Sequence, residues 1–277
     1  MNTVPVRAGL RRGRIEFRQS MTNPTELWNS MFFPVIALVV MFFLRENTVP
    51  GTTFSLGTQS IPGILAMNFM FNGLLGLGII LTMEREDGTL LRAKAIPNGT
   101  LGYLVGKVTS RAAVTVVGAI LPLAVVSLVF DGLRLDVVTL LWVLVLGLVA
   151  VLPIGAILGA VFKNAQAMGF MSLVVFLLLA VSGVFYPITA LPEWLQWIAQ
   201  VFPLYWLGLG LRSALLPDSL SAVEIGESWR HLETVGVLGL WAVVGFVFAP
   251  MLLRRMARRE SGSTVAASRA KAMQRTM

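Results

Sequence analysis

Long apolar stretches follow one another along the chain, and the short segments between them contain most of the charge. A hydrocarbon core about 30 Å thick is crossed by about 20 mostly apolar residues in a helix. Six stretches meet this length: Leu27–Leu44, Ile61–Met83, Leu104–Phe130, Val137–Phe162, Ala165–Tyr186 and Leu232–Leu253. The pattern predicts an all-α polytopic membrane protein with six transmembrane helices.

A seventh apolar stretch, Leu191–Leu216, differs from the six because helix-breaking and charged residues interrupt it. The interruptions are Pro192, Pro203, Gly208, Gly210 and Arg212. Non-helical backbone at membrane depth is tolerated only where protein or water surrounds it. We therefore expect a re-entrant or interfacial pair of short helices here, inside a large outer loop that covers residues 187–231.

The basic residues predict the orientation. With the N-terminus in the cytoplasm and six alternating spans, 18 of the 22 Lys and Arg residues lie on the cytoplasmic side. The outer four are Arg45, Arg134, Arg212 and Arg230. Cytoplasmic loops carry an excess of Lys and Arg, so we expect a multi-pass protein of the cytoplasmic membrane with both termini cytoplasmic. A seventh full span would place the Arg254–Arg259 cluster outside, which the same rule disfavours.

The two ends of the chain flank this transmembrane domain, which covers residues 27–253. Residues 1–26 are basic and predict an interfacial helix whose arginines face lipid headgroups; a partly ordered basic tail is the alternative. Residues 254–277 form a second basic segment, a cytoplasmic tail. The first apolar stretch begins only near Leu27 and no small-residue cleavage site follows it, so we expect a retained span.

Composition excludes several classes of function. Charged residues make up 13% of the chain, against about 25% in soluble domains. Cysteine is absent and His231 is the one histidine, which excludes disulfides, cysteine chemistry and histidine-cluster metal sites. The net charge of +8 accompanies apolar stretches, so we expect membrane lipids, and not nucleic acid, as its partner.

Catalytic and nucleotide-binding motifs are also missing from the sequence. The predicted spans have no Asp, Glu or His at mid-depth, which disfavours acid–base catalysis and an ion-driven carrier. Gly106-Lys107 comes nearest to a phosphate-binding loop, but Leu101 and Val108 replace its first glycine and its hydroxyl residue. We expect no cofactor in this chain.

The segment between the second and third spans, residues 84–99, has the densest interior charge. It carries Glu84, Arg85, Glu86, Asp87, Arg92 and Lys94. Such a loop either is solvated and only satisfies topology, or docks on a soluble partner through charge-assisted hydrogen bonds.

Two blocks of sequence resemble a known family. Glu84-Arg-Glu-Asp-Gly-Thr-Leu is similar to the Glu-Arg-Glu-x-Gly-Thr segment of ABC type-2 exporter permeases. Later segments resemble that family's second signature block, in the same order: Ser182-Gly-Val-Phe-Tyr-Pro-Ile, Leu191-Pro-Glu-Trp-Leu-Gln, Phe202-Pro-Leu and Leu211-Arg-Ser. Within the family, the chain most resembles the daunorubicin-resistance permeases.

The resemblance implies the transmembrane subunit of an ATP-binding-cassette exporter. Two permeases, identical or paralogous, would each sit on a separate ATP-binding subunit that holds ATP and magnesium. The implied cargo is hydrophobic or amphipathic: a drug or antibiotic, giving efflux and drug resistance, or a lipid or glycolipid. The coupling residues would be Glu84, Arg85, Glu86, Asp87, Gly88, Thr89 and Arg92.

Other functions remain open at this point. They are a polysaccharide-exporting permease of the same family, a lipid-modifying membrane enzyme that uses the acids of Asp218–Glu233, and a channel or ion-driven carrier.

A few residues in or near the spans are candidates for the transport path. Asn68 and Asn72 are four residues apart and share one helix face, where they either line the path or pack between helices. Ser182, Phe185 and Tyr186 end the fifth predicted span, and the resemblance implies that they close the path to the outside. Aromatic residues at this depth also serve as interfacial belt residues.

Overall fold

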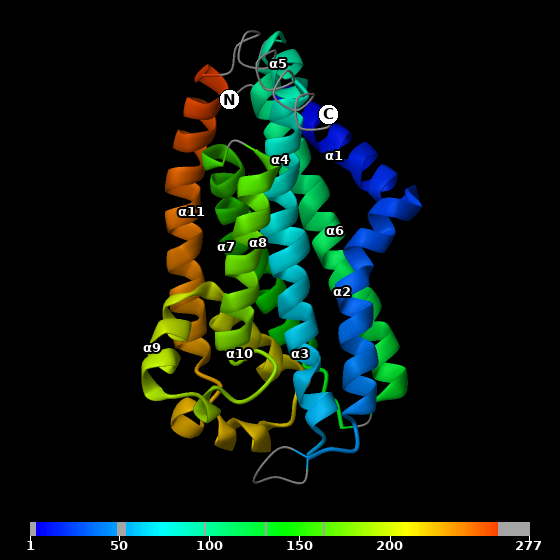
Figure 1. Cartoon of the computed structure of the whole chain (residues 1–277), viewed down its shortest axis with the longest axis vertical. Coiled ribbons are helices and arrows are strands. Elements are labelled where there is room, and N and C mark those ends of the chain that lie inside the picture. The colour runs from blue at the N-terminus through cyan, green and yellow to red at the C-terminus, as the bar shows by residue number, and fades with distance from the viewer. Residues whose placement is uncertain (1–3, 49–53, 97, 131, 163, 260–277) are drawn as a thin grey trace.

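The computed structural model describes residues 4–48, 54–96, 98–130, 132–162 and 164–259. These residues are almost entirely helical, apart from loops and an isolated bridge between Thr48 and Ser55. The long helices run side by side along one axis of the molecule (Figure 1). The predicted all-α fold is confirmed.

Five helical stretches of the described chain are long and apolar enough to cross a membrane. They are α2 (Pro24–Phe43), α3 to α4 (Leu56–Asn68 and Gly76–Glu86), α6 (Gly99–Val129), α7 (Val137–Val161) and α11 (His231–Arg259). α3 and α4 form one rod because the π-helical segment Phe69–Leu75 joins them without a break.

The fifth predicted span is shorter than the sequence suggested. Its helix, α8 (Ala165–Val181), has 17 residues and ends before Ser182, whereas the prediction extended it to Tyr186. Gly183 has a φ of +61°, which turns the backbone out of the helix. Residues 182–186 therefore belong to a turn and not to a span.

The elements outside these long helices gather at the two ends of the bundle (Figure 1). α1 (Val4–Thr22), the short α5 (Thr89–Lys94) and the last turns of α11 lie at one end, which we call the α5 end. α9 (Glu193–Val201) and α10 (Pro203–Leu215) lie near the other, the α10 end. The basic N-terminal segment is thus helical, and Asn23 caps the following α2 by accepting from the Thr25 N–H at 3.0 Å.

The broken stretch Leu191–Leu216 forms a pair of short helices, as its Pro and Gly content predicts. Pro203 begins α10, where its missing N–H costs no hydrogen bond. Every residue of α10 is buried, against α3, α7 and α11. α9 instead exposes Trp194 and Trp197. Short 3₁₀ turns at Ile188–Ala190, Asp218–Val223 and Ile225–Glu227 complete this end.

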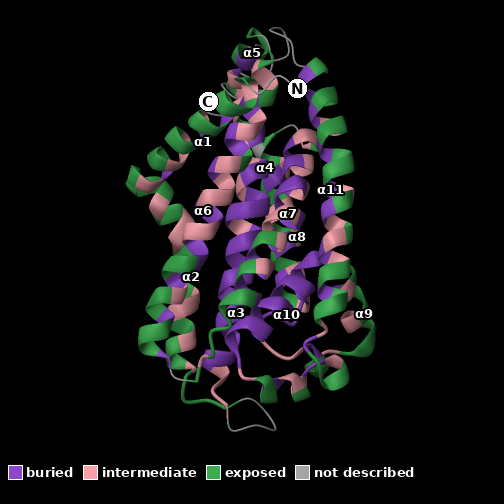
Figure 2. Ribbon diagram, turned by 180° about the vertical axis from the view of Figure 1, so that it is seen from behind, coloured by how far each residue is buried: buried purple, intermediate pink, exposed green. Residues whose placement is uncertain are grey.

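Burial is concentrated on the α3–α4 rod and α10, while α2 and the outer side of α11 are largely exposed (Figure 2). In α2 only Pro34 is buried. The larger apolar core fills the middle of the bundle and the α10 end. A smaller one, including Leu81, Leu90 and Leu253, joins α4, α5 and α11 at the α5 end.

Candidate functional site

The turn between α4 and α5 is built by the charged motif itself. Gly88 has a φ of +79°, which reverses the chain after α4. The Thr89 N–H donates to Asp87 Oδ1 at 2.8 Å, which closes the turn immediately before α5. Arg92 Nη2 donates to Thr89 Oγ1 at 2.8 Å and closes the first turn. Asp-Gly-Thr therefore specifies the sharp corner from which α5 projects.

The short α5 has a buried side and an exposed side. Leu90 and Ala93 are buried in the smaller core, together with Leu253 and Met256 of α11. Arg92 is exposed on α5, and Ile96, two residues after the end of this helix, is 63% exposed. A push on the exposed side would therefore be passed through packed side chains to α4 and α11.

Four charged side chains from three helices meet behind this corner, and we call them the Lys107 cluster: Arg12, Glu16, Glu84 and Lys107. Lys107 Nζ on α6 is hydrogen-bonded to Glu84 Oε1 at the end of α4. The same Nζ lies 2.9 Å from Glu16 Oε1 on α1, which also accepts from Arg12 Nε at 2.8 Å. Two positive and two negative charges are thus joined across α1, α4 and α6.

Tyr103 extends the cluster by a cation–π contact. The Arg12 guanidinium carbon lies 5.0 Å from the Tyr103 ring centroid, and Lys107 Nζ lies 5.8 Å from it. Such contacts add attraction where the cation is partly desolvated. The Lys107 side chain is 8% exposed and Glu84 is 21% exposed, but Glu84 Oε2 is itself buried, so the cluster is half-buried.

Glycines let α1 lie close enough to α6 for these contacts. A Cβ on Gly9 would lie 2.6 Å from the Gly102 carbonyl oxygen, and one on Gly13 would lie 2.8 Å from the Gly106 carbonyl oxygen. Both distances are too short for a side chain. The arginines Arg7, Arg11, Arg14 and Arg18 are exposed, and their spacing places them on the opposite face of α1.

A second ion pair lies at the α10 end and is almost fully enclosed. Arg212 Nε of α10 lies 2.8 Å from Glu224 Oε1, and the two side chains are 2% and 1% exposed. Arg212 Nη1 also donates to the Gly183 carbonyl at 2.7 Å. This Arg212 pair ties α10 to the turn after α8 and to the outer loop.

Comparison with known families decides what kind of protein carries these two charged sites. Residues 13–216 match the ABC-2 type transporter model, which covers most of the chain. The chain belongs to the ABC-2 type transporter family. No curated protein matches it significantly. The family assignment makes this a membrane permease component that spans the bilayer several times, and such permeases generally work with an ATP-binding subunit.

The coupling residues predicted for this ABC-2 permease do not form one exposed surface. Glu84 faces inward to Lys107, and Asp87 accepts from the Thr89 N–H in the turn before α5. Arg92 is exposed on the outer side of α5. Glu86 ends α4, and Arg85 precedes it, half-buried. The motif therefore contributes both to the corner and to the outward surface, and its coupling role remains a prediction.

Asn68 and Asn72 of the ABC-2 permease bridge helices in the middle of the bundle. Asn68 Nδ2 donates to the Thr115 carbonyl of α6 at 2.7 Å, and Asn72 Nδ2 donates to Asn68 Oδ1 at 2.7 Å. Asn72 Nδ2 also lies 3.2 Å from the Ser30 carbonyl of α2. These contacts hold three helices together, whether or not the pair lines a path.

The three residues predicted to close the path lie in the turn after α8. Ser182 is buried and donates to the Leu179 carbonyl at 2.9 Å. Ser60 of α3 donates to the Phe185 carbonyl at 2.8 Å, and Tyr186 bonds back to the Ala180 carbonyl. The structure thus places them at the α10 end, at the opposite end of the bundle from the α5 corner.

Sequence reasoning missed Lys107, Glu16 and the Arg212 pair as elements of the sites. From the sequence alone, Gly106-Lys107 is an incomplete phosphate-binding loop. Arg212 is an outer charge that interrupts the seventh apolar stretch and is part of the second signature block, but this does not predict its partner Glu224. The sequence did contain a signal for the contact between Lys107 and Glu16. Gly9 and Gly13 on α1 have the same four-residue spacing as Gly102 and Gly106 on α6. The match predicts close helix packing, which brings Lys107 and Glu16 within reach of each other.

Proposed function

We propose that this ABC-2 chain is the membrane subunit of an exporter driven by ATP hydrolysed on a separate subunit. In this proposal α8 is the fifth of six spans, α9 and α10 form the re-entrant pair, and the α5 end faces the cytoplasm. Two permease copies, or one copy and a paralogue, would pair in the membrane. Each would sit on an ATP-binding subunit that holds ATP and magnesium.

The observation that carries the proposal is the two-sided α5. Its outer side presents Arg92, and the exposed Ile96 follows just after the helix, a combination of charge and apolar surface suited to a soluble partner. Its inner side is packed against α4, α6 and α11. A rigid displacement of α5 would therefore move several helices together.

The Lys107 cluster supports the same function because it connects three helices next to the α4–α5 turn. Glu84 lies in the last turn of α4, at the end of the long α3–α4 rod. Lys107 of α6 binds Glu84 and also binds Glu16, so it connects the rod to both α6 and α1. A movement that begins at α5 would thus reach α1 and the α3–α4 rod at the same time. In this role Glu84 transmits movement inside the permease, and the outward residues make the contact with the ATPase.

The cargo we propose is hydrophobic or amphipathic, as a drug, an antibiotic, a lipid or a glycolipid is. The mid-bundle polar groups described here are neutral amides such as Asn68 and Asn72, which suits an uncharged path. At the α10 end, the turn containing Ser182, Phe185 and Tyr186 is held by Ser60 and Arg212. Closing of the path by this turn remains part of the proposal.

Co-purification tests the ATPase contact directly. Arg92→Glu combined with Ile96→Asp changes the outer side of α5 and leaves the buried Leu90 and Ala93 in place. We expect the variant to be inserted normally but to lose the ATP-binding subunit during purification in mild detergent, together with cargo-stimulated ATP hydrolysis. Arg7→Glu, on the exposed face of α1, is the matched control and should retain both. Full retention of the ATPase by the double variant would contradict the proposal.

The orientation has its own test, because the chain contains no cysteine. A single Thr89→Cys thiol should be protected from a membrane-impermeant reagent in intact cells and become labelled in inverted vesicles. Labelling in intact cells would place α5 outside, where no ATP-binding subunit could reach it.

A further inference from the structure

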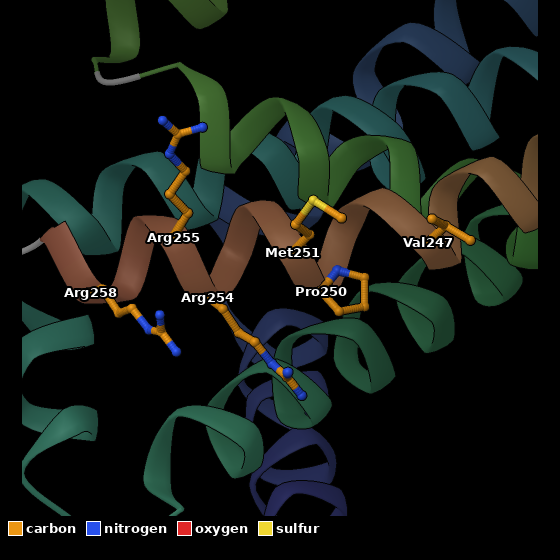
Figure 3. Close-up of a pocket in the computed structure, with 6 residues that line it drawn as sticks. All are labelled: Val247, Pro250, Met251, Arg254, Arg255 and Arg258. Carbon is orange, nitrogen blue, oxygen red and sulfur yellow. The ribbon is translucent and has the colours of Figure 1, made fainter.

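The last turns of α11 form a groove that the described chain does not fill. It is about 630 Å³ in volume, and its lining residues are Val247, Pro250, Met251, Arg254, Arg255 and Arg258. At 3.6 residues per turn, all six positions fall on one side of the helix. Figure 3 shows Arg254 and Arg258 leaving α11 on the same side, with Pro250 between Val247 and the arginines.

The groove lies on the outward face of α11. Val247 is 54% exposed and Met251 is 59% exposed, and the three arginines are exposed as well. The opposite face of the same turns is buried: Leu253 and Met256 pack in the smaller core with α5. The packing of α11 on the bundle therefore leaves the groove to whatever surrounds the protein.

The arginines of the groove differ from those at the two charged sites. Arg12 and Arg212 pair with Glu16 and Glu224, whereas within the described chain no carboxylate pairs with the groove arginines. The sequence from residue 234 to residue 259 contains no Asp or Glu at all. A ligand with a negative charge would therefore meet three arginines that no carboxylate of the described residues pairs with.

The groove also has two chemical levels along the helix axis. Arg258 follows Val247 by eleven positions, which corresponds to a rise of about 16 Å along the helix axis. One level is apolar, with Val247, Pro250 and Met251, and the next is cationic. A phospholipid has the same order: acyl chains below, and a phosphodiester above them at the membrane surface.

We propose that this groove binds one anionic phospholipid as a resident ligand. The phosphodiester lies between Arg254 and Arg258, and an acyl chain lies along Met251 and Val247. Arginine suits the phosphate because its planar guanidinium donates two parallel hydrogen bonds. The site is separate from the proposed cargo path, and it does not depend on coupling to an ATPase; only the leaflet follows from the proposed orientation.

A second copy of the chain fits this face less well. Most homodimers are two-fold symmetric, so each patch near the axis meets the same patch of its partner. Pairing through the groove would bring two arginine clusters together, and like charges across an interface are unfavourable.

Native mass spectrometry of the purified full chain tests the site. The protein in detergent is titrated with phosphatidylglycerol, with phosphatidylcholine and with inorganic phosphate. We expect one tightly held phosphatidylglycerol per chain and its loss in Arg254→Gln/Arg258→Gln, with affinity falling roughly 30-fold if each arginine contributes as it does near an anionic membrane. Arg254→Lys/Arg258→Lys keeps the charge and should lose less.

Two further variants separate a built site from general attraction. Arg7→Gln/Arg18→Gln removes the same charge from the exposed face of α1 and should change phosphatidylglycerol binding less than about fivefold, which is one arginine's share. Val247→Trp fills the apolar level and should weaken lipid binding with all arginines present. Equal loss in the α1 control, unchanged binding in Arg254→Gln/Arg258→Gln, equal binding of phosphatidylcholine, or competition by phosphate alone would each overturn the proposal.

Discussion

The two charged sites of this permease use the same kinds of side chain in opposite ways. The Lys107 cluster joins three helices, shares one lysine between two glutamates, and leaves Glu84 21% exposed. The Arg212 pair has one partner for each charge, with exposures of 2% and 1%, and is completed by a backbone carbonyl. The Lys107 cluster is shared and half-buried, whereas the Arg212 pair is closed to solvent.

The difference indicates which end of the bundle can rearrange. A shared donor lets Glu16 and Glu84 exchange partners at lower cost than in a closed pair, because Lys107 stays paired with one of them and both side chains are partly exposed. Separating Arg212 from Glu224 would leave two charges in a dry core, where desolvation outweighs other terms. We therefore interpret the α5 end as the adjustable part and the Arg212 pair as a fixed support for α10.

The largest effect is expected at the Arg212 pair. Arg212→Leu leaves Glu224 buried without its cation, which costs about 3–5 kcal/mol of folding stability. Thermal unfolding and monodispersity in detergent would measure the loss. Arg134→Leu is the control, since the Arg134–Asp218 pair is exposed on both sides, and its cost should not exceed about 1 kcal/mol. Arg212→Leu/Glu224→Leu should recover much of the stability; a single variant as stable as the control would remove the distinction between the sites.

A smaller effect is expected at the Lys107 cluster. Lys107→Met leaves Glu16 and Glu84 facing each other, but both side chains are partly exposed, so we expect a loss of about 1–3 kcal/mol of folding stability. The loss should be local: hydrogen exchange should speed up in α1 while α10 keeps its protection. Arg92→Met, on the exposed side of α5, should leave exchange in α1 unchanged. Uniformly faster exchange through the whole bundle would show that the cluster supports the fold and is not an adjustable joint.

Asn68 tests the region between the two ends. Asn68→Leu removes the bonds to Thr115 and Asn72, and interhelical hydrogen bonds in membranes contribute about 0.6–2 kcal/mol. If Asn68 only packs helices, efflux of all cargoes should fall in proportion to folded protein. If it lines the path, an apolar and an amphipathic cargo should respond differently at matched expression. Transport assays with the two cargoes and a melting curve distinguish these outcomes.

The sequence predicted the elements of this fold better than their contacts. Apolar length alone located the long helices, and Pro203 marked where the broken stretch divides into α9 and α10. The predicted end of the fifth span was wrong because a count of apolar residues does not detect the left-handed turn at Gly183.

The candidate sites were harder to predict, because their partners are far apart in the chain. Glu16 and Lys107 are 91 positions apart, and only the glycine contact between α1 and α6 brings them together. Arg212 was counted as an outer loop charge, since a buried arginine becomes plausible only once Glu224 and the Gly183 carbonyl are in place. Charge density did identify the α4–α5 corner, but it could not separate the inward Glu84 from the outward Arg92.

The smallest effect is expected at Asp136, which caps α7 at the α10 end and is exposed. Its hydrogen bond from the Thr139 hydroxyl, followed by the Thr139 and Val138 N–H groups, lowers the pKa of the carboxyl group. A lowered pKa in the folded state means that the stabilisation is complete above the unfolded pKa of about 3.9 and is lost as the pH falls through the folded value. Asp136→Asn keeps an acceptor oxygen for the cap but cannot titrate. Melting temperatures of the two proteins should therefore converge as the pH falls below about 4; a difference that is constant with pH would show that the carboxylate charge does not contribute to the cap.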